Sequence, residues 1–330
     1  MSGAGPRRLS RRRFLRFATT GVAAPLVVPV ALGPGAAHAS YRHDYQPPRL
    51  TEAAAAFVDT PDAASHIRPV ELTLSTDAVF QGGALQVRVP RALSARAKLF
   101  GREYPLQTAR EGPTGYIGIG VLDPPGEAVV EVEARDILAG TTHLSQAITV
   151  QATDWSVAHI WLPEGVGDLL DPALMREERE LLAEVYGGYT WRQWEEPWLS
   201  PIEEDVPITS PFGEQRSFNG GPVGGHHGGT DFGAVTGTAV LAANNGTVVL
   251  ARELAVRGKM VIVDHGSGVY TGYAHLSEID VSEGGAVQKG QVVGLVGTTG
   301  LSTGPHLHWE HAVLGVLVDG LRWLDGSQGF

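Results

Sequence analysis

Histidines and an aspartate at short, regular spacings make the last third of this 330-residue sequence its chemically richest part. Seven of the twelve histidines fall between positions 226 and 311. His227 and Asp231 lie in a glycine-rich stretch, where glycine permits the backbone angles that let both side chains turn toward one point. His306 and His308 are two positions apart, and on a strand such residues share a face. Imidazole and carboxylate groups brought together in this way are typical ligands of a hydrolytic metal site.

The number of available ligands also fits such a site. A catalytic zinc ion uses three protein ligands and keeps a fourth position for water, so two histidines and one aspartate are enough. The sequence has no cysteine, which excludes disulfides, thiolate ligands, a cysteine nucleophile and a lipoprotein anchor. Each motif alone has a plain structural interpretation, as a strand face or a capped turn. Their coincidence with His275, at the end of another alternating stretch, favours the metal site.

The order and spacing of these motifs resemble those of the lysostaphin-type, or LytM-domain, zinc endopeptidases. The family patterns are H-x-G-x-D, G-T-x-V-x-A, Y-x-H-L and G-x-T-G-x-x-T-G-x-H-L-H, and they match residues 227–231, 237–242, 273–276 and 297–308. Upstream, residues 208–213 resemble the strand with which the family domain begins. We therefore expect a peptidase domain of this kind in the C-terminal part of the chain.

The resemblance implies a role for each residue of the site. The zinc ligands would be His227, Asp231 and His308, and the two unligated catalytic histidines would be His275 and His306. It also implies one Zn²⁺ per chain and hydrolysis of a peptide bond in peptidoglycan, either in a glycine bridge or at a D-alanyl cross-link. One catalytic histidine would take a proton from water while the other stabilises the oxyanion or protonates the leaving amine. The sequence leaves open which histidine does which.

Three further histidines of this region receive structural interpretations. His226 is adjacent to His227, but only His227 has an aspartate at the family's spacing. His265 is expected to be structural, with a hydrogen bond to a neighbouring strand. His311 is out of phase with His308 on the same strand, so it is expected to face away from the site.

Two other classes of function are alternatives. One is a zinc-free module of the same fold that binds peptidoglycan or activates another hydrolase; the complete set of five site residues argues against it. The other is a carrier domain of the lipoyl or biotinyl kind, which residues 281–294 resemble. Such a domain displays a lysine at a tight turn between matching strands, and Lys259 and Lys289 lack that setting.

The first 39 residues have the three parts of an export signal. Residues 10–16, SRRRFLR, resemble the twin-arginine motif, an apolar stretch follows, and residues 37–39 form an A-x-A cleavage pattern. Prolines at positions 25, 29 and 34 interrupt the apolar stretch, so no stable membrane span is expected once the signal is removed. We expect export by the twin-arginine route to the periplasm, the cell envelope or the medium.

The charge of the remaining chain excludes some partners. Six of the 25 basic residues lie in the first 39 positions, which hold no acid, so the rest of the chain has 19 basic and 36 acidic residues and a net charge of −17. Such a surface repels nucleic acid and anionic lipid headgroups. The family resemblance and the expected export, not the charge, imply a peptidoglycan peptide as the partner.

The elements that would position the site are mostly β-strands. After an exposed lead segment, residues 40–68, alternating runs with regular turns predict a β-sandwich over residues 69–151 that resembles an immunoglobulin-like module. The runs cover residues 70–74, 84–89, 116–121 and 128–133. Residues 152–205 are predicted to be a helical connector, with a helix at 172–186 that begins after the N-cap Asp171.

The rest of the connector and the C-terminal part complete this prediction. The tryptophan-rich residues 191–201 are expected to pack across the domain seam, or else to wall a binding groove. Residues 206–330 are predicted to be the peptidase domain, a compact antiparallel sheet folded on itself. Its expected strands are residues 240–250, 259–264, 269–275, 292–296 and 306–311.

Overall fold

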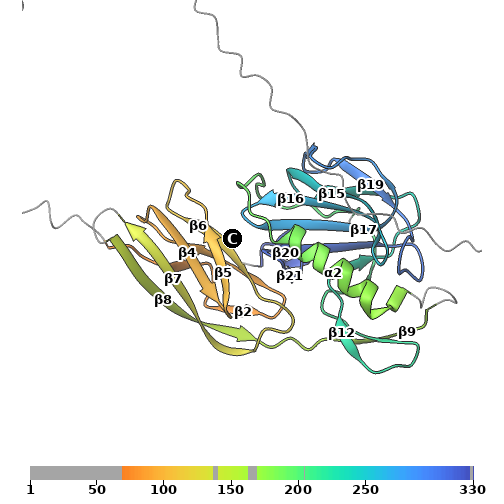
Figure 1. The fold of residues 1–330 in the computed structure, drawn as a ribbon, viewed down its shortest axis with the longest axis horizontal. Helices are drawn as coiled ribbons and strands as arrows, with labels where there is room; N and C mark the ends of the chain where they lie inside the picture. The colour runs from red at the N-terminus through yellow and green to blue at the C-terminus, as the bar shows by residue number, and fades with distance from the viewer. Residues whose placement is uncertain (1–68, 137–139, 163–168, 204, 328–329) are drawn as a thin grey trace, which may run out of the picture. The chain divides into compact units, whose positions relative to one another are not determined.

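The computed structural model describes residues 69–330 except 137–139, 163–168, 204 and 328–329 (Figure 1). The predicted signal, residues 1–39, and the lead segment, residues 40–68, lie outside the described residues. The chain divides into units 1–63 and 64–330, so everything described belongs to the second unit. Within that described part, no helix is both long and apolar enough to cross a membrane.

The first β-region consists of two sheets that share one core. The smaller has the order β1-β3-β6 and the larger the order β2-β8-β7-β4-β5. Their bounds are β1 Thr73–Leu74, β2 Ala78–Phe80, β3 Ala84–Arg88, β4 Ser94–Leu99, β5 Arg102–Leu106, β6 Thr114–Gly118, β7 Gly126–Asp136 and β8 Gly140–Gln151. On β7 the buried residues Val130, Val132 and Ala134 alternate with more exposed ones, which is why one face joins the core. The predicted strands overlap β1, β3, β6 and β7, while the immunoglobulin-like assignment stays a prediction.

The connector contains the predicted helix with the predicted bounds, α2 (Pro172–Tyr186). Oδ1 of Asp171 accepts hydrogen bonds from the backbone N–H groups of Ala173 at 2.7 Å and Leu174 at 3.2 Å. Such an N-cap stabilises a helix by about 1 kcal/mol. Leu182 and Tyr186 are buried against apolar residues of the large C-terminal sheet, so α2 covers one face of that sheet (Figure 1).

The C-terminal part is built on a ten-stranded sheet. Its main path runs β10-β13-β20-β17-β16-β15-β18, with β14 and β19 paired to each other beside it and β21 on β20. The bounds are β10 Ile208–Ser210, β13 Thr230–Phe232, β14 Ala239–Leu241, β15 Gly246–Leu254, β16 Gly258–Gly266, β17 Val269–Ile279, β18 Ala286–Val287, β19 Val292–Val296, β20 Leu307–Val313 and β21 Val316–Val318, and a short helix, α3 (Leu321–Leu324), follows. All its pairings are antiparallel, as expected.

One predicted strand was wrong in extent. Residues 240–250 form the end of β14 and the start of β15, separated by a turn around Asn244. The Asn244 side chain accepts the backbone N–H of Asn245 at 2.9 Å and donates to the carbonyl of Glu195 at 2.7 Å. Asparagine commonly turns the chain through such local hydrogen bonds, and these override the apolar run in the sequence.

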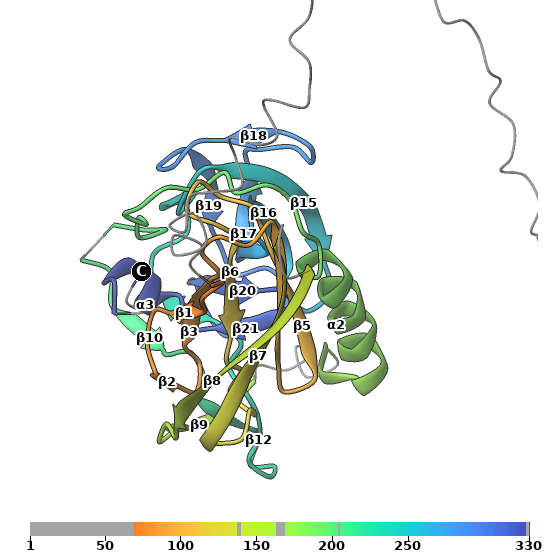
Figure 2. The same ribbon diagram turned by 90° about the vertical axis from the view of Figure 1, so that its left-hand side faces the viewer.

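A second, small sheet joins the connector to the C-terminal region. Strand β9 (Val157–Ile160) pairs in parallel with β11 (Gln215–Phe218), and β11 pairs with β12 (Gly224–His226). The labels β9 and β12 lie together in both ribbon views (Figures 1 and 2). Because β12 leads directly to the residues at 227–231, this sheet helps to hold the start of the candidate site.

The tryptophan-rich segment 191–201 packs into the core, as the seam interpretation predicts. Trp194 is 3% exposed and its ring centroid lies 5.3 Å from that of Tyr116 on β6 and 5.2 Å from that of Trp198. Trp194 also contacts Trp323 of α3, with the ring centroids 5.9 Å apart. The segment therefore joins residues of the first β-region to residues of the C-terminal one.

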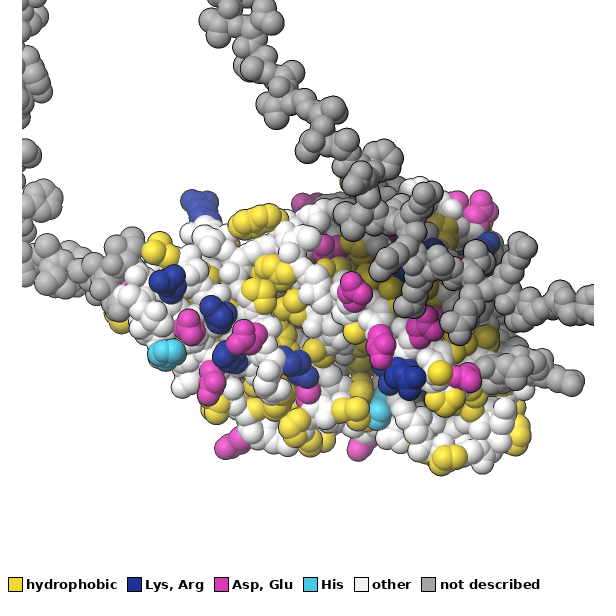
Figure 3. Space-filling view, viewed as in Figure 1, with side chains coloured by type: hydrophobic (Ala, Val, Ile, Leu, Met, Phe, Trp, Pro, Cys, Tyr) yellow, Lys and Arg dark blue, Asp and Glu magenta, His cyan; other side chains and the backbone are white. Residues whose placement is uncertain are grey.

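One face of the described part of the chain carries both acidic and basic side chains (Figure 3). On the face seen in Figure 3, acidic and basic side chains lie interspersed among apolar ones. On this face the described residues form no continuous basic stripe of the kind that nucleic acids bind.

Candidate metal centre

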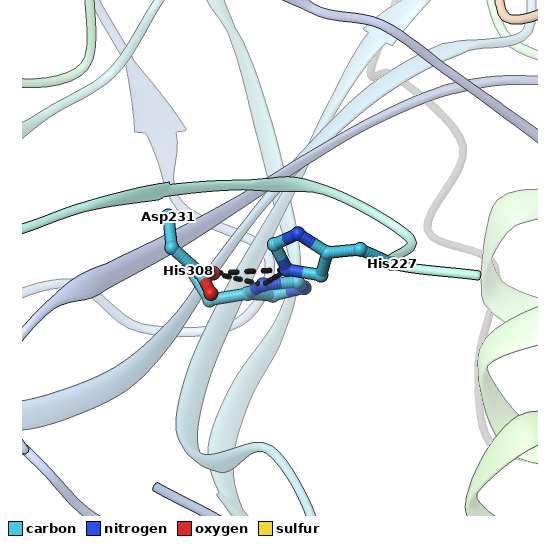
Figure 4. Close-up of side chains that lie close together, drawn as sticks. All are labelled: His227, Asp231 and His308. Atoms are coloured by element: carbon cyan, nitrogen blue, oxygen red, sulfur yellow. Dashed lines mark hydrogen bonds and ion pairs between the residues drawn. The ribbon is translucent and has the colours of Figure 1, made fainter. Parts of the chain in front are cut away.

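Two neighbouring strands and the loop before one of them bring together His227, Asp231 and His308. Asp231 on β13 is paired directly with His308 on β20, so both side chains leave the sheet at the same point. His227 reaches that point from the loop that precedes β13. Nδ1 of His308 lies 2.7 Å from Oδ1 of Asp231 and 2.9 Å from Nε2 of His227. Figure 4 shows the two imidazoles and the carboxylate pointing toward one another.

The hydrogen bonds on the outer side of each imidazole show why this group suits a cation. Nδ1 of His227 lies 3.0 Å from the carbonyl oxygen of Pro211, which can only accept, so Nδ1 carries the proton and Nε2 has a free lone pair. Nε2 of His308 lies 3.1 Å from Oε1 of Glu310, which leaves the lone pair of its Nδ1 free in the same way. Two lone pairs and a carboxylate then face one point. These atoms, which lie within 4.8 Å of one another, could hold a metal ion.

Burial and charge favour a neutral His227 and an ionised Asp231, but they favour a protonated His308. Burial lowers the pKa of His227 to about 4. Burial also opposes ionisation of Asp231, but His227 and His308 outweigh it and hold the pKa of that carboxyl well below its usual range. Burial alone would lower the pKa of His308, whereas Asp231 and Glu310 outweigh it and raise the pKa. An ionised aspartate and a neutral His227 are ready to bind a metal ion, whereas His308 has to release a proton when it binds one.

The loop between His227 and Asp231 depends on the absence of a side chain at Gly229. A Cβ atom there would lie 2.4 Å from the carbonyl oxygen of Trp309 and 2.9 Å from Cε1 of His308. Real Cβ atoms do not come so close, and the first neighbour is backbone, which cannot move aside cheaply. Glycine therefore allows the loop to lie directly on β20, next to the ligand histidine.

Replacing Gly229 by alanine is expected to push the loop off β20. Overpacking of this kind costs about 1–3 kcal/mol of stability, and displacement of His227 should weaken metal binding by about tenfold or more. Titration of metal against a chromophoric chelator would measure it. Gly224→Ala is the control, because a Cβ there has nothing within 4 Å. Equal metal affinity in both variants would contradict the prediction.

His275 reaches the site through an irregularity in β17. Its backbone has φ of +60°, the left-handed region that residues other than glycine rarely adopt. The pairing of β17 with β16 shifts register at this place, between the partners of Lys259 and Val261. Nδ1 of His275 lies 2.7 Å from the carbonyl oxygen of Thr299, so this nitrogen carries the proton and Nε2 is free. Backbone strain of this kind is concentrated at functional sites. Here the strained residue is His275, whose ring lies beside that of His308.

His306 lies beside His275, one residue before β20 begins at Leu307. The ring centroids of the two histidines are 4.7 Å apart. Nδ1 of His306 lies 2.8 Å from the carbonyl oxygen of Gly304, and its Nε2 lies 3.7 Å from Oδ1 of Asp231. Burial, together with His308 and His306, lowers the pKa of His275 to about 3. Both histidines thus present a free Nε2 at the edge of the three-residue cluster.

A groove of about 280 Å³ opens over these side chains. Its apolar lining comes from both the C-terminal region and the connector: Ile160, Leu162, Met175, Phe218, Val256 and Leu301. Five imidazoles line it as well, those of His226, His227, His275, His306 and His308. None of the residues 191–201 belongs to this lining. Trp191, Arg192 and Glu196 line a separate hollow, so the groove-wall interpretation of that segment stays a prediction.

The other three histidines lie apart from the cluster. Nδ1 of His226 lies 2.9 Å from the carbonyl oxygen of Gly213, and His226 is not among the three convergent residues. His265 is fully buried, with Nδ1 2.7 Å from the carbonyl oxygen of Asn245. His311 stacks on Trp323 with ring centroids 4.4 Å apart, on the opposite face of β20 from His308. The structural interpretations of His265 and His311 are confirmed.

His265 makes the stability of the fold depend on pH. Burial lowers the pKa of His265 from 6.5 to about 4, so the unfolded chain binds its proton between these pH values and the folded chain does not. The stabilisation is complete above pH 6.5 and is lost as the pH falls toward 4. Lowering the pH from 7 to 5 should cost about 2 kcal/mol of unfolding free energy through this residue.

Urea denaturation in a chelator-containing buffer at pH 7 and pH 5 would measure this loss. His265→Asn is the comparison, since it removes the titrating group. The variant should be less stable at pH 7 but should lose less stability than the wild type on acidification. An identical loss in both proteins would refute the assignment to His265.

Two charged residues that contact the cluster, Glu310 and Arg216, were not predicted from the sequence. Glu310 follows His308 by two positions on β20, so the extended pattern H-x-H-x-E, read with the strand period, could have revealed it. Arg216 on β11 lies with Nη2 3.1 Å from Oδ2 of Asp231. No local signal marks Arg216, because a single arginine in an alternating run is usually a solvated side chain.

Comparison with known proteins agrees with this geometry. Residues 225–320 match Peptidase family M23. The peptidoglycan DD-endopeptidase ShyA of Vibrio cholerae is 38% identical over 122 residues, which are 37% of this chain and 28% of ShyA. The DD-carboxypeptidase/endopeptidase Mpg of Neisseria meningitidis serogroup B is 44% identical over 89 residues, 27% of this chain and 20% of Mpg. The chain thus spans less than a third of the length of either relative.

A structural likeness extends further along the chain. The crystal structure of a protein from Pseudomonas aeruginosa described as a peptidase M23 superposes with a TM-score of 0.56 at 26% identity. It covers 74% of this chain and 94% of that protein, so the shared fold reaches beyond residues 225–320. The matched residues hold all three side chains of the cluster and both neighbouring histidines. This part of the chain is therefore a domain of peptidase family M23.

Proposed function

We propose that the chain is a zinc-dependent endopeptidase that hydrolyses peptide bonds in bacterial peptidoglycan. The observation that carries the proposal is the convergence of Nε2 of His227, Oδ1 of Asp231 and Nδ1 of His308 on one point, with their other polar atoms held by hydrogen bonds. These three residues are the proposed ligands of one Zn²⁺. The absence of cysteine and the nitrogen and oxygen donor set suit hydrolytic zinc. A zinc ion held there would lower the pKa of bound water and polarise a carbonyl group.

The two remaining histidines are the proposed proton carriers. His275 and His306 each fix Nδ1–H on a backbone carbonyl, that of Thr299 or of Gly304, and direct a free Nε2 toward the cluster. One accepts the proton of the attacking water, and the other, once protonated, donates to the leaving amine or stabilises the oxyanion. The short separation of the two rings allows both to reach one scissile peptide bond.

The proposed substrate follows from the relatives. ShyA is named a peptidoglycan DD-endopeptidase and Mpg a DD-carboxypeptidase/endopeptidase, which favours a bond at a D-alanyl cross-link over one in a glycine bridge. An extended peptide suits the open groove over the site. The proposed location, outside the cytoplasm after twin-arginine export, gives the enzyme access to this polymer. The domain limits predicted from the sequence, with the peptidase domain at residues 206–330, are part of the proposal.

Digestion of purified peptidoglycan tests the proposed function. The chain should bind one Zn²⁺, and mass spectrometry of the products should show new peptide ends at D-alanyl cross-links but not at glycine bridges. Removal of the metal by a chelator should stop product formation, and Zn²⁺ should restore it. Binding to peptidoglycan without metal and without new peptide ends would instead identify a non-catalytic module.

A further inference from the structure

The buried carboxylate of Glu310 contacts the candidate ligand His308 on the side of its ring away from Asp231. Glu310 is 0% exposed and lies two positions after His308 on β20, so both side chains leave the same face. Oε1 of Glu310 accepts from Nε2 of His308 at 3.1 Å and from Nε of Arg257 at 2.8 Å. Its Oε2 accepts from the hydroxyl of Tyr186 at 2.6 Å. The carboxylate is thus paired with a cation and hydrogen-bonded on both oxygens, as burial of a charge requires.

The donors of this carboxylate lead to helix α2. Tyr186 is the last residue of α2, and Glu178 lies on the same helix, where both are buried. Oε1 of Glu178 lies 3.2 Å from Nη1 of Arg257, so Arg257 bridges Glu178 and Glu310. The Glu178 carboxylate also accepts the backbone N–H groups of Val256 at 2.7 Å and Arg257 at 3.1 Å. Two side chains of α2 therefore bind groups next to the site: Tyr186 binds the Glu310 carboxylate, and Glu178 binds the loop at Val256 and Arg257.

The loop held by α2 also supports the second candidate histidine. The carbonyl oxygen of Arg257 accepts the backbone N–H of His275 at 2.9 Å. His275 has its unusual backbone conformation at this position. One buried network thus contacts a candidate metal ligand through its side chain and a candidate proton carrier through its backbone.

The hydrogen bond from Glu310 decides which nitrogen of His308 is free. With a carboxylate facing Nε2, the proton stays on Nε2 and Nδ1 keeps its lone pair toward His227 and Asp231. Without that acceptor, the proton can move to Nδ1, and the ring can turn about its bonds. Outer partners of metal-bound histidines act in this way, and their loss typically weakens metal binding by about 10–100-fold.

We propose that Glu310 is a positioning residue for His308. In this proposal Tyr186 and Glu178 of helix α2 hold Glu310 in place, Tyr186 directly and Glu178 through Arg257, so α2 supports metal binding. This inference rests on the proposed function, because it assumes that His308 binds the metal. Neither α2 residue lies within the stretch that matches the family, residues 225–320. Residues predicted to be a connector between domains thereby contribute to the site.

The test compares metal affinity in conservative variants of the full chain. Glu310→Gln and Tyr186→Phe keep the shape of each side chain and remove the charge or the hydroxyl. Competition with a chromophoric chelator measures Zn²⁺ affinity, which should fall about 10–100-fold for Glu310→Gln and about tenfold for Tyr186→Phe. Tyr270→Phe is the matched control, because Tyr270 lies in the same apolar cluster and packs edge-on against Tyr186, with the ring centroids 5.8 Å apart. The Zn²⁺ affinity of this variant should stay at the wild-type value.

The outcomes separate the inference from the proposed function. If the wild type binds one Zn²⁺ and both variants bind it equally well, the positioning role is wrong and the metal site stands. A fall in affinity as large in Tyr270→Phe as in Tyr186→Phe would also overturn the inference, since general loosening would explain it. A wild type that binds no Zn²⁺ would overturn both proposals. Should Glu310→Gln fail to fold, Tyr186→Phe still decides the question.

Discussion

Replacing His308 by alanine is expected to abolish both the bound metal and the hydrolysis of peptidoglycan. Nδ1 of His308 lies 2.7 Å from Oδ1 of Asp231 and 2.9 Å from Nε2 of His227, so its loss leaves two of the three convergent donors. A hydrolytic zinc site needs three protein ligands. The fall in Zn²⁺ affinity should exceed the roughly 10–100-fold effect of losing a supporting hydrogen bond. Metal analysis of the purified protein and mass spectrometry of peptidoglycan digests would measure the two losses.

His226→Ala is the control for this experiment. His226 is adjacent to His227 and lines the same groove, but its Nδ1 lies against the carbonyl oxygen of Gly213. This variant should keep its metal. Metal retained at the wild-type level in His308→Ala, or lost in His226→Ala, would show that the ligand set is wrong.

The His306→Ala variant should separate catalysis from metal binding. Nε2 of His306 lies 3.7 Å from Oδ1 of Asp231, and His306 is not one of the three convergent residues. The variant should therefore bind Zn²⁺ like the wild type. Loss of a proton carrier lowers a rate by about 10²–10⁴-fold, so kcat should fall by that amount. Metal content and initial rates on a soluble cross-linked peptide would test both halves of the prediction.

An exposed histidine provides the reference for His306. His143→Ala on β8 removes an exposed imidazole that does not line the groove, and it should keep both metal and rate. Hydrolysis by His306→Ala at the wild-type rate would refute the proton-carrier role. Loss of metal in that variant would instead make His306 a ligand.

Local chain geometry explains which parts of the site the sequence predicted. His306 and His308 share a strand face because side chains alternate along a strand, and the glycines between His227 and Asp231 allow a turn. These relations act between residues a few positions apart, so they can be read without the fold. The bounds of α2 were predictable for the same reason, since Asp171 caps its own helix.

Tertiary contacts decided the rest. Tyr186 and Glu310 are 124 positions apart, and only the packing of α2 on the sheet brings the hydroxyl to the carboxylate. His275 points into the site because a register shift in β17 gives it a left-handed backbone, which the alternating pattern of the sequence does not encode. By itself the sequence determined which side chains could bind a metal and the local turns and strands that carry them. The folded chain decided which buried groups hold those side chains in place, because hydrogen bonds between distant elements form only after the sheet and helix have packed.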